Sequence, residues 1–191
     1  MTGAKAEAIV IGASAGALEA LSAILPLLPA DYGLPVMIVV HIPPDKKSVI
    51  AELFQAKCKI EVREAEDKEP IRGGTVYFAP PDYHLLVEAD KTLSLSADEP
   101  VFYSRPSLDV LFESAADAYG PNLIAIVLTG ANEDGAMGLK AVFEADGIAI
   151  VQRPEEAYAQ GMPAAAMAAC PEARVLSLKE IALYLTEIEK S

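Results

Sequence analysis

The sequence predicts a doubly wound α/β domain, in which a mostly parallel β-sheet is flanked by helices. Apolar, β-branched runs alternate along the chain with segments whose apolar residues recur at helical spacing. Most of these runs are nearly continuous in apolar character, as expected of strands buried on both faces of a sheet. The chain has 191 residues, enough for one well-filled core, so residues 1–191 are expected to form a single domain.

Each element follows from its local pattern. Five apolar runs are predicted to be strands: 7–13, 35–41, 59–65, 123–130 and 147–152. Helical spacing predicts helices at 17–28, 48–57, 107–119, 133–145 and 178–190. Residues 73–96 break the alternation, because two turn signals divide them into three short strands. These strands are too close together for crossover helices, so a short antiparallel meander is expected there.

Composition excludes several classes of protein. The formal net charge of −13 repels polyphosphate, which argues against a nucleic-acid partner. No apolar run reaches the roughly 18 residues of a membrane helix, and the first residues do not resemble a secretion signal. We therefore expect a cytoplasmic protein without direct membrane insertion. The two cysteines and two histidines do not form a metal-ligand pattern, so neither a metal nor a cofactor is expected.

Three polar residues follow three different predicted strands. Ser14 lies in "IGASAG" after the first strand, His41 follows the second, and Asp134 lies in "TGANEDGA" after strand 123–130. In an open parallel sheet, ligands bind beyond the carboxyl ends of the strands, where such residues gather. We therefore expect the three side chains to meet at one rim of the sheet.

The turn around Ser14 allows two interpretations. Read as G-x-S-x-G, it is a nucleophile elbow, with His41 as the base that activates the serine and Asp134 as the group that orients the histidine. Backbone N–H groups of Ala15 and Ala131 are the candidate oxyanion donors. Read as a glycine-rich phosphate loop, it indicates a nucleotide-binding module, although Ser14 occupies the middle glycine position of that fingerprint. Ser14 and Asp134 are also suitable helix caps, and His41 a suitable core residue.

The chain resembles a known family over nearly its whole length: the catalytic domain of the CheB chemotaxis methylesterases. Six blocks carry the resemblance, in the order and approximate spacing of the family: "IGASAGALEAL", "HIPP", "VYFAPPDYHLLV", "SRPSLDVLFESAA", "LTGANEDGAMGL" and "YAQGMPAAAM". The resemblance implies a catalytic triad of Ser14, His41 and Asp134. It also implies hydrolysis of γ-glutamyl methyl esters on the helical cytoplasmic region of transmembrane chemoreceptors, in some members with deamidation of glutamine.

The same resemblance exposes departures and weaker assignments. The family usually has threonine at position 15 and Met-Gly at positions 131–132, where this chain has Ala15 and Ala131-Asn132. A non-catalytic docking domain that retains the fold is therefore an alternative. Members often carry an N-terminal receiver domain, which is not expected here, so a separate receiver or sensor domain is the implied regulatory partner. Three further residues are expected to lie near the cleft: His84, Arg105 and Met162.

Overall fold

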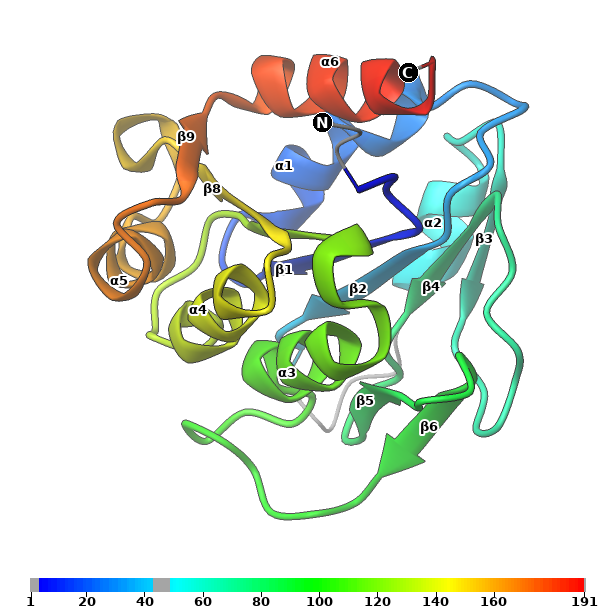
Figure 1. The fold of residues 1–191 in the computed structure, drawn as a ribbon, viewed down its shortest axis with the longest axis horizontal. Helices are drawn as coiled ribbons and strands as arrows, with labels where there is room; N and C mark the ends of the chain where they lie inside the picture. Colours follow the sequence, from blue (N-terminus) through cyan, green and yellow to red (C-terminus); the bar gives the residue numbers. More distant parts are fainter. Residues whose placement is uncertain (1–3, 43–48, 191) are drawn as a thin grey trace.

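A parallel sheet of seven strands forms the centre of the molecule (Figure 1). The computed structural model describes residues 4–42 and 49–190. The strands of the sheet, in spatial order, are β3 (Glu61–Glu64), β4 (Thr75–Phe78), β2 (Val36–Val40), β1 (Ala8–Ala13), β7 (Leu123–Val127), β8 (Ile148–Gln152) and β9 (Arg174–Leu176). All six neighbouring pairs are parallel. Strands β5 (His84–Val87) and β6 (Leu93–Ser96) form a separate antiparallel pair. The predicted fold class is confirmed.

Helices cover both faces of the sheet (Figure 1). On one side lie α1 (Ala17–Ser22), α2 (Ile50–Gln55) and α6 (Leu178–Glu187), and on the other lie α3 (Leu108–Tyr119), α4 (Ala136–Glu144) and α5 (Gly161–Ala169). Short 3-10 turns complete the described elements: η1 (Leu25–Leu27), η2 (Gly120–Asn122), η3 (Pro154–Glu156) and η4 (Ile188–Lys190).

Alternation along the central strand builds the two hydrophobic cores. Ile9 and Ile11 of β1 point to the core beneath α1, α2 and α6, whereas Ala8 and Val10 point to the core beneath α3, α4 and α5. All four side chains are fully buried. Successive side chains of a strand face opposite sides of a sheet, so a continuous apolar run fills both cores at once.

The segment 73–96 differs from the prediction in one respect. The first of its three expected strands, β4, does not join an antiparallel meander, because it pairs in parallel with β2 and β3. All four residues of β4 are buried, as a strand covered on both faces requires. Only β5 and β6 form the antiparallel pair. The connection from β3 to β4, residues 65–74, crosses between parallel strands without a helix.

Two helical segments also differ from the pattern. The helix expected at 17–28 ends at Ser22, and Leu25–Leu27 continue as a 3-10 turn. Pro26 lies in that turn and has no N–H with which to extend an α-helix. Helix α5 and strand β9 were not predicted, since the alanine-rich "GMPAAAMAA" lacks an amphipathic period. The first residue of the helix expected at 48–57 lies outside the described residues.

The strands are added to the sheet on both sides of β1. From β1 the chain builds outward through β2 on one side and through β7 on the other. The loops that follow these three strands therefore diverge at one rim, which is where open α/β sheets bind ligands. No helix within residues 4–42 and 49–190 is both long enough and apolar enough to cross a membrane.

Candidate active site

Ser14 lies on a tight turn between β1 and α1. The backbone N–H of Ser14 donates to the carbonyl oxygen of Thr129 at 2.9 Å, which ties the turn to the loop after β7. Gly16 has a φ of 85°, in the left-handed region that favours glycine. A Cβ atom at Gly12 would lie 2.0 Å from the side chain of Leu108, so the strand before the turn also needs glycine for close packing against α3. These features are those of a strand-to-helix elbow that presents a serine.

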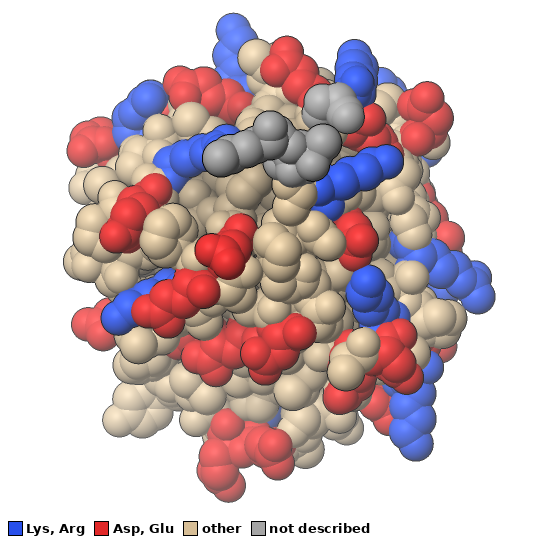
Figure 2. All heavy atoms as spheres, in the orientation of Figure 1, with Lys and Arg blue, Asp and Glu red and all other residues tan. Residues whose placement is uncertain are grey.

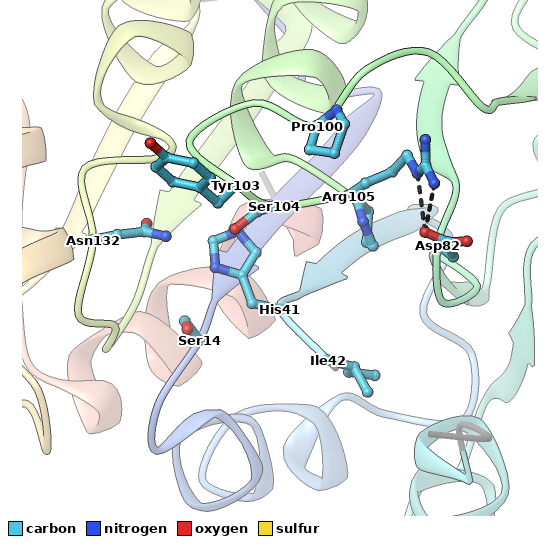
Figure 3. A pocket seen from close by; sticks show the side chains of 10 residues that line it. Ser14, His41, Ile42, Asp82, Pro100, Tyr103, Ser104, Arg105 and Asn132 are labelled. Carbon is cyan, nitrogen blue, oxygen red and sulfur yellow. Dashed lines mark hydrogen bonds and ion pairs between the residues drawn. The ribbon is translucent and has the colours of Figure 1, made fainter. Parts of the chain in front are cut away.

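His41 and Asp134 are joined by a hydrogen bond. The Nε2 atom of His41, just beyond β2, lies 2.7 Å from Oδ2 of Asp134 in the loop before α4. The Asp134 side chain is completely buried, and that of His41 is 11% exposed. The imidazole therefore contacts the buried carboxylate on one side and is partly exposed on the other. His41 and Ser14 line the same pocket (Figure 3).

Asp134 is held by the start of helix α3. Its carboxylate accepts from the backbone N–H of Leu108 at 2.7 Å, from the N–H of Asp109 at 3.0 Å and from the Ser107 hydroxyl at 2.8 Å. Burial alone works against ionisation, but the hydrogen bonds from His41, Asp109 and Leu108 outweigh it and keep the pKa of Asp134 below its ordinary value. Asp134 is thus an ionised acceptor for the ring of His41.

The hydrogen bond between His41 and Asp134 determines which nitrogen of the histidine ring carries the proton. Because Nε2 donates to the Asp134 carboxylate, the neutral ring keeps Nδ1 as its acceptor. Serine proteases of the chymotrypsin type use the two nitrogens in the opposite sense. Within the described part of the chain, the Ser14 hydroxyl makes no hydrogen bond, so it is free for a bound molecule or for the ring of His41.

Two hollows meet at Ser14. The first, of about 370 Å³, is polar on one wall and includes Asp82, Tyr103, Arg105 and Asn132. The second, of about 650 Å³, runs between α1 and α2 and is mostly apolar, with Leu18, Val49, Leu53 and Tyr158 among its lining residues. Ser14, His41 and Ile42 belong to both hollows. A substrate that reached Ser14 would therefore meet a polar wall on one side and an apolar wall on the other.

The structure places the remaining predicted residues in different settings. Arg105 lines the polar pocket, where its guanidinium contacts Asp82 at 2.7 Å. Ala15 lines the apolar hollow, but Ala131 lines neither hollow, and its neighbour Asn132 lines the polar one. The predicted oxyanion donor of this loop, the backbone N–H of Ala131, therefore belongs to a residue next to one that lines the polar hollow.

His84 and Met162 do not line the two hollows at Ser14. His84 is buried, with Nε2 2.9 Å from the Glu99 carbonyl oxygen and Nδ1 accepting from the N–H of Ser107. Met162 is fully buried against Gly130, where an added Cβ would lie 2.6 Å from the methionine sulfur. Both residues shape the loops that carry the site and do not form its surface.

Some supporting residues were not predicted from the sequence. Asp109 accepts from the N–H groups of Gly135 and Gly138, and Gln152 accepts from the N–H of Thr129 at 2.9 Å. The contacts of Asp109 had a signal in the sequence, namely an acidic residue in the first turn of a predicted helix and the glycines of "DGAMG". Nothing in the sequence indicated the contact between Gln152 and Thr129, because the two residues follow or end different strands and are distant in the chain.

The described residues contain no group of three or more histidine, cysteine, aspartate or glutamate side chains placed to hold a metal ion. Charged side chains are dispersed on the face drawn in Figure 2, where lysine and arginine are interrupted by acidic and uncharged residues. A binding site for polyphosphate normally gathers basic side chains on one face. The arrangement at Ser14 instead combines a hydroxyl, an imidazole and a buried carboxylate.

Comparison with known proteins agrees with this arrangement. A family model described as CheB methylesterase matches residues 9–185. The chain belongs to the CheB methylesterase family. The expected family and enzyme class, a CheB-type methylesterase, are confirmed.

Solved and curated CheB relatives match closely. The crystal structure of the Thermotoga maritima CheB methylesterase catalytic domain superposes with a TM-score of 0.91 at 32% identity, and the match covers 96% of this chain and 99% of that one. A Leptospira interrogans protein, provisionally named a protein-glutamate methylesterase/protein-glutamine glutaminase, is 48% identical over 97% of this chain and 96% of its own length. An Archaeoglobus fulgidus protein of the same name is 38% identical over 83% of this chain, but only 46% of its own length is matched.

Proposed function

We propose that this CheB family member hydrolyses γ-glutamyl methyl esters on the methylated cytoplasmic region of transmembrane chemoreceptors, with Ser14 as nucleophile. The observation that supports it most directly is the 2.7 Å hydrogen bond between His41 and the buried Asp134, in the pocket that Ser14 also lines. A serine hydroxyl needs a neighbouring base, and a histidine base needs an orienting acceptor. The names of the relatives, which include methylesterase activity, agree with this chemistry.

In the first half of the reaction, Ser14 Oγ attacks the carbonyl carbon of the ester and its proton passes to Nδ1 of His41. Asp134 holds the ring by Nε2 and stabilises the imidazolium. The tetrahedral oxyanion then collapses, the bond to the methoxy oxygen breaks, and His41 returns the proton so that methanol leaves. The product is a glutamyl ester of Ser14.

In the second half, a water molecule attacks the acyl-enzyme and gives its proton to His41. Collapse of the second oxyanion releases the glutamate side chain, and Ser14 recovers its proton from the ring. The N–H of Ala15, directly after the nucleophile, is the proposed oxyanion donor of the elbow. The same steps with ammonia as the leaving group would deamidate a glutamine, the second activity in the names of the relatives.

The setting of the reaction is also a proposal. We place the enzyme in the cytoplasm, on a receptor segment outside the membrane. A separate receiver or sensor domain is the proposed regulatory partner, and residues 1–191 are the proposed single catalytic domain. Mixing the purified chain with candidate receiver domains, in both phosphorylation states, and measuring methanol release would test this regulation.

The decisive experiment is release of methanol from membranes that contain methylated receptors. The purified chain is expected to release methanol, and Ser14→Ala is expected to release none while its circular dichroism spectrum and melting temperature are unchanged. A docking domain without catalysis would bind the membranes and release no methanol. A nucleotide-binding module would show saturable thermal stabilisation by NAD or a nucleotide, which the esterase proposal does not predict.

A further inference from the structure

Asn132 is a polar side chain on the wall of the Ser14 pocket that the mechanism above does not use. It follows β7 in the loop that carries Asp134, and it lines the polar pocket with Ser14 and His41. Figure 3 shows its side chain extending from that loop toward His41, above Ser14.

The carboxamide of Asn132 has a defined orientation. Its Oδ1 accepts from the backbone N–H of Asp134 at 3.0 Å, and a backbone N–H can be paired only with the oxygen of the amide. The Nδ2 group must therefore occupy the other branch. Among the described residues it donates to no group. One hydrogen bond thus locks the side chain, and its two N–H bonds are left for a molecule in the pocket.

This geometry suits an oxyanion donor. Such a donor is most effective when it is already oriented before charge develops, because no reorganisation is then needed during the reaction. The Asn132 amide is neutral, planar and anchored to the residue that orients His41. Ala131, the other donor expected from this loop, does not line the pocket.

We propose that Asn132 is a catalytic residue, whose Nδ2 donates to the oxyanion that develops from the ester carbonyl oxygen and stabilises it together with the N–H of Ala15. The inference rests on the proposed ester hydrolysis at Ser14. It assigns to a side chain the role that a backbone group of the loop would otherwise serve.

Two substitutions separate this role from the structural role of Asn132. Asn132→Ala removes the amide, and Asn132→Asp removes its N–H groups but keeps an oxygen acceptor for the N–H of Asp134. Glu133→Gln, at the exposed neighbouring position, is the matched control. For both Asn132 variants kcat for methanol release is expected to fall about 10²–10³-fold, the usual loss of one oxyanion donor, with KM little changed. Glu133→Gln is expected to retain wild-type kcat.

Affinity for a boronic acid provides a second readout. Its adduct with Ser14 is a negatively charged, tetrahedral boronate whose hydroxyl oxygen takes the place of the oxyanion, so its inhibition constant should rise as kcat/KM falls in both Asn132 variants. A purely structural role would lower the melting temperature and leave the affinity of the remaining folded enzyme unchanged.

Several results would overturn the proposal. One is wild-type kcat in Asn132→Ala, and another is a loss confined to Asn132→Asp, which would indicate an effect of the added charge. A fall in kcat without weaker boronate affinity is a third. Equal methanol release by wild type and Ser14→Ala would instead refute the proposed function itself. Should Asn132→Ala fail to fold, Asn132→Gly, which also removes the amide without adding a charge, takes its place in both the kinetic and the boronate measurements.

Discussion

Asp109 and Asp134 cap each other's helices. The Asp134 carboxylate accepts the first N–H groups of α3, including that of Asp109, and the Asp109 carboxylate accepts from Gly135 and Gly138 at the start of α4, at 3.0 and 2.7 Å. The two helices are therefore joined at their N-termini by two buried acidic side chains. Carboxylates at such positions are favoured by the helix dipole and by unpaired N–H groups.

The reciprocal capping has consequences for the titration of Asp109. Burial, and then the nearby charge of Asp134, raise the pKa of Asp109 from 3.8 to about 6, although its bonds from Gly138 and Gly135 act in the opposite direction. The folded protein therefore binds a proton more tightly than the unfolded chain. The stability that this provides is complete below about pH 4 and is lost as pH rises through about 6.

The first prediction concerns Asp109→Asn, which keeps the oxygen acceptor and removes the charge. Between pH 4 and 7 its free energy of unfolding should decline less than that of the wild type, measured by urea denaturation at several pH values. Asp109→Ala is the contrasting variant, because it leaves the buried N–H groups of Gly135 and Gly138 without an acceptor. Its loss should be about 2–6 kcal/mol, at about 1–3 kcal/mol per unpaired group. Identical pH slopes for wild type and Asp109→Asn would contradict the account.

The second prediction concerns Asp134→Asn. An amide at this position can donate to Nε2 of His41 and so favour the tautomer that has its proton on Nδ1, where it cannot accept from Ser14. We expect kcat for methanol release to fall by about 10⁴-fold, as when an orienting carboxylate becomes an amide in a serine protease. The variant also loses an ionised cap of α3, so melting temperature should be measured beside activity. Activity near the wild-type level would exclude Asp134 as the orienting group.

The third prediction concerns the turn after Ser14. Gly16→Ala introduces a side chain at a φ of 85°, where an L-residue costs about 1–2 kcal/mol, and places its Cβ 2.7 Å from Cβ of Tyr158. We expect a lower free energy of unfolding together with a large loss of kcat, because the elbow must shift. Adding Tyr158→Gly removes that Cβ and should relieve the contact but not the backbone strain. Full recovery in the double variant would attribute the effect to the contact alone.

The fourth prediction concerns Thr129, whose hydroxyl donates to the carbonyl oxygen of Ala15 at 2.8 Å and accepts from the N–H of Ala159 at 2.9 Å. Thr129→Val keeps the shape and removes both bonds, so stability should fall by about 1–3 kcal/mol per unpaired group. Because the elbow loses a tie to the loop after β7, kcat/KM should fall at least about tenfold, the effect of 1.4 kcal/mol. Thr129→Ser keeps the hydroxyl and should retain most of the activity. Equal kinetics in the two variants would exclude this tie.

The chain pattern was sufficient for the architecture and for the position of three polar residues. A nearly continuous apolar run such as Ala8–Ala13 is typical of a strand that is buried on both faces. A residue directly after a parallel strand lies at the carboxyl rim of the sheet. Ser14 and His41 directly follow β1 and β2 and were therefore placed from local information, whereas Asp134 lies farther along the loop after β7 and reaches His41 through the course of that loop. The catalytic roles of all three residues await the experiments above.

Tertiary packing decided what local patterns leave open. Strand β4 joined the parallel sheet because its four buried residues needed cover on both faces, which short spacing to β5 did not reveal. Burial and hydrogen bonding removed His84 from the cleft surface, selected Nε2 of His41 for Asp134, and turned the Asn132 amide toward the pocket. Each of these outcomes depends on contacts between residues distant in sequence or on the three-dimensional course of a loop. Periodicity reports which face of an element is apolar, but it does not report which partner that face or side chain meets.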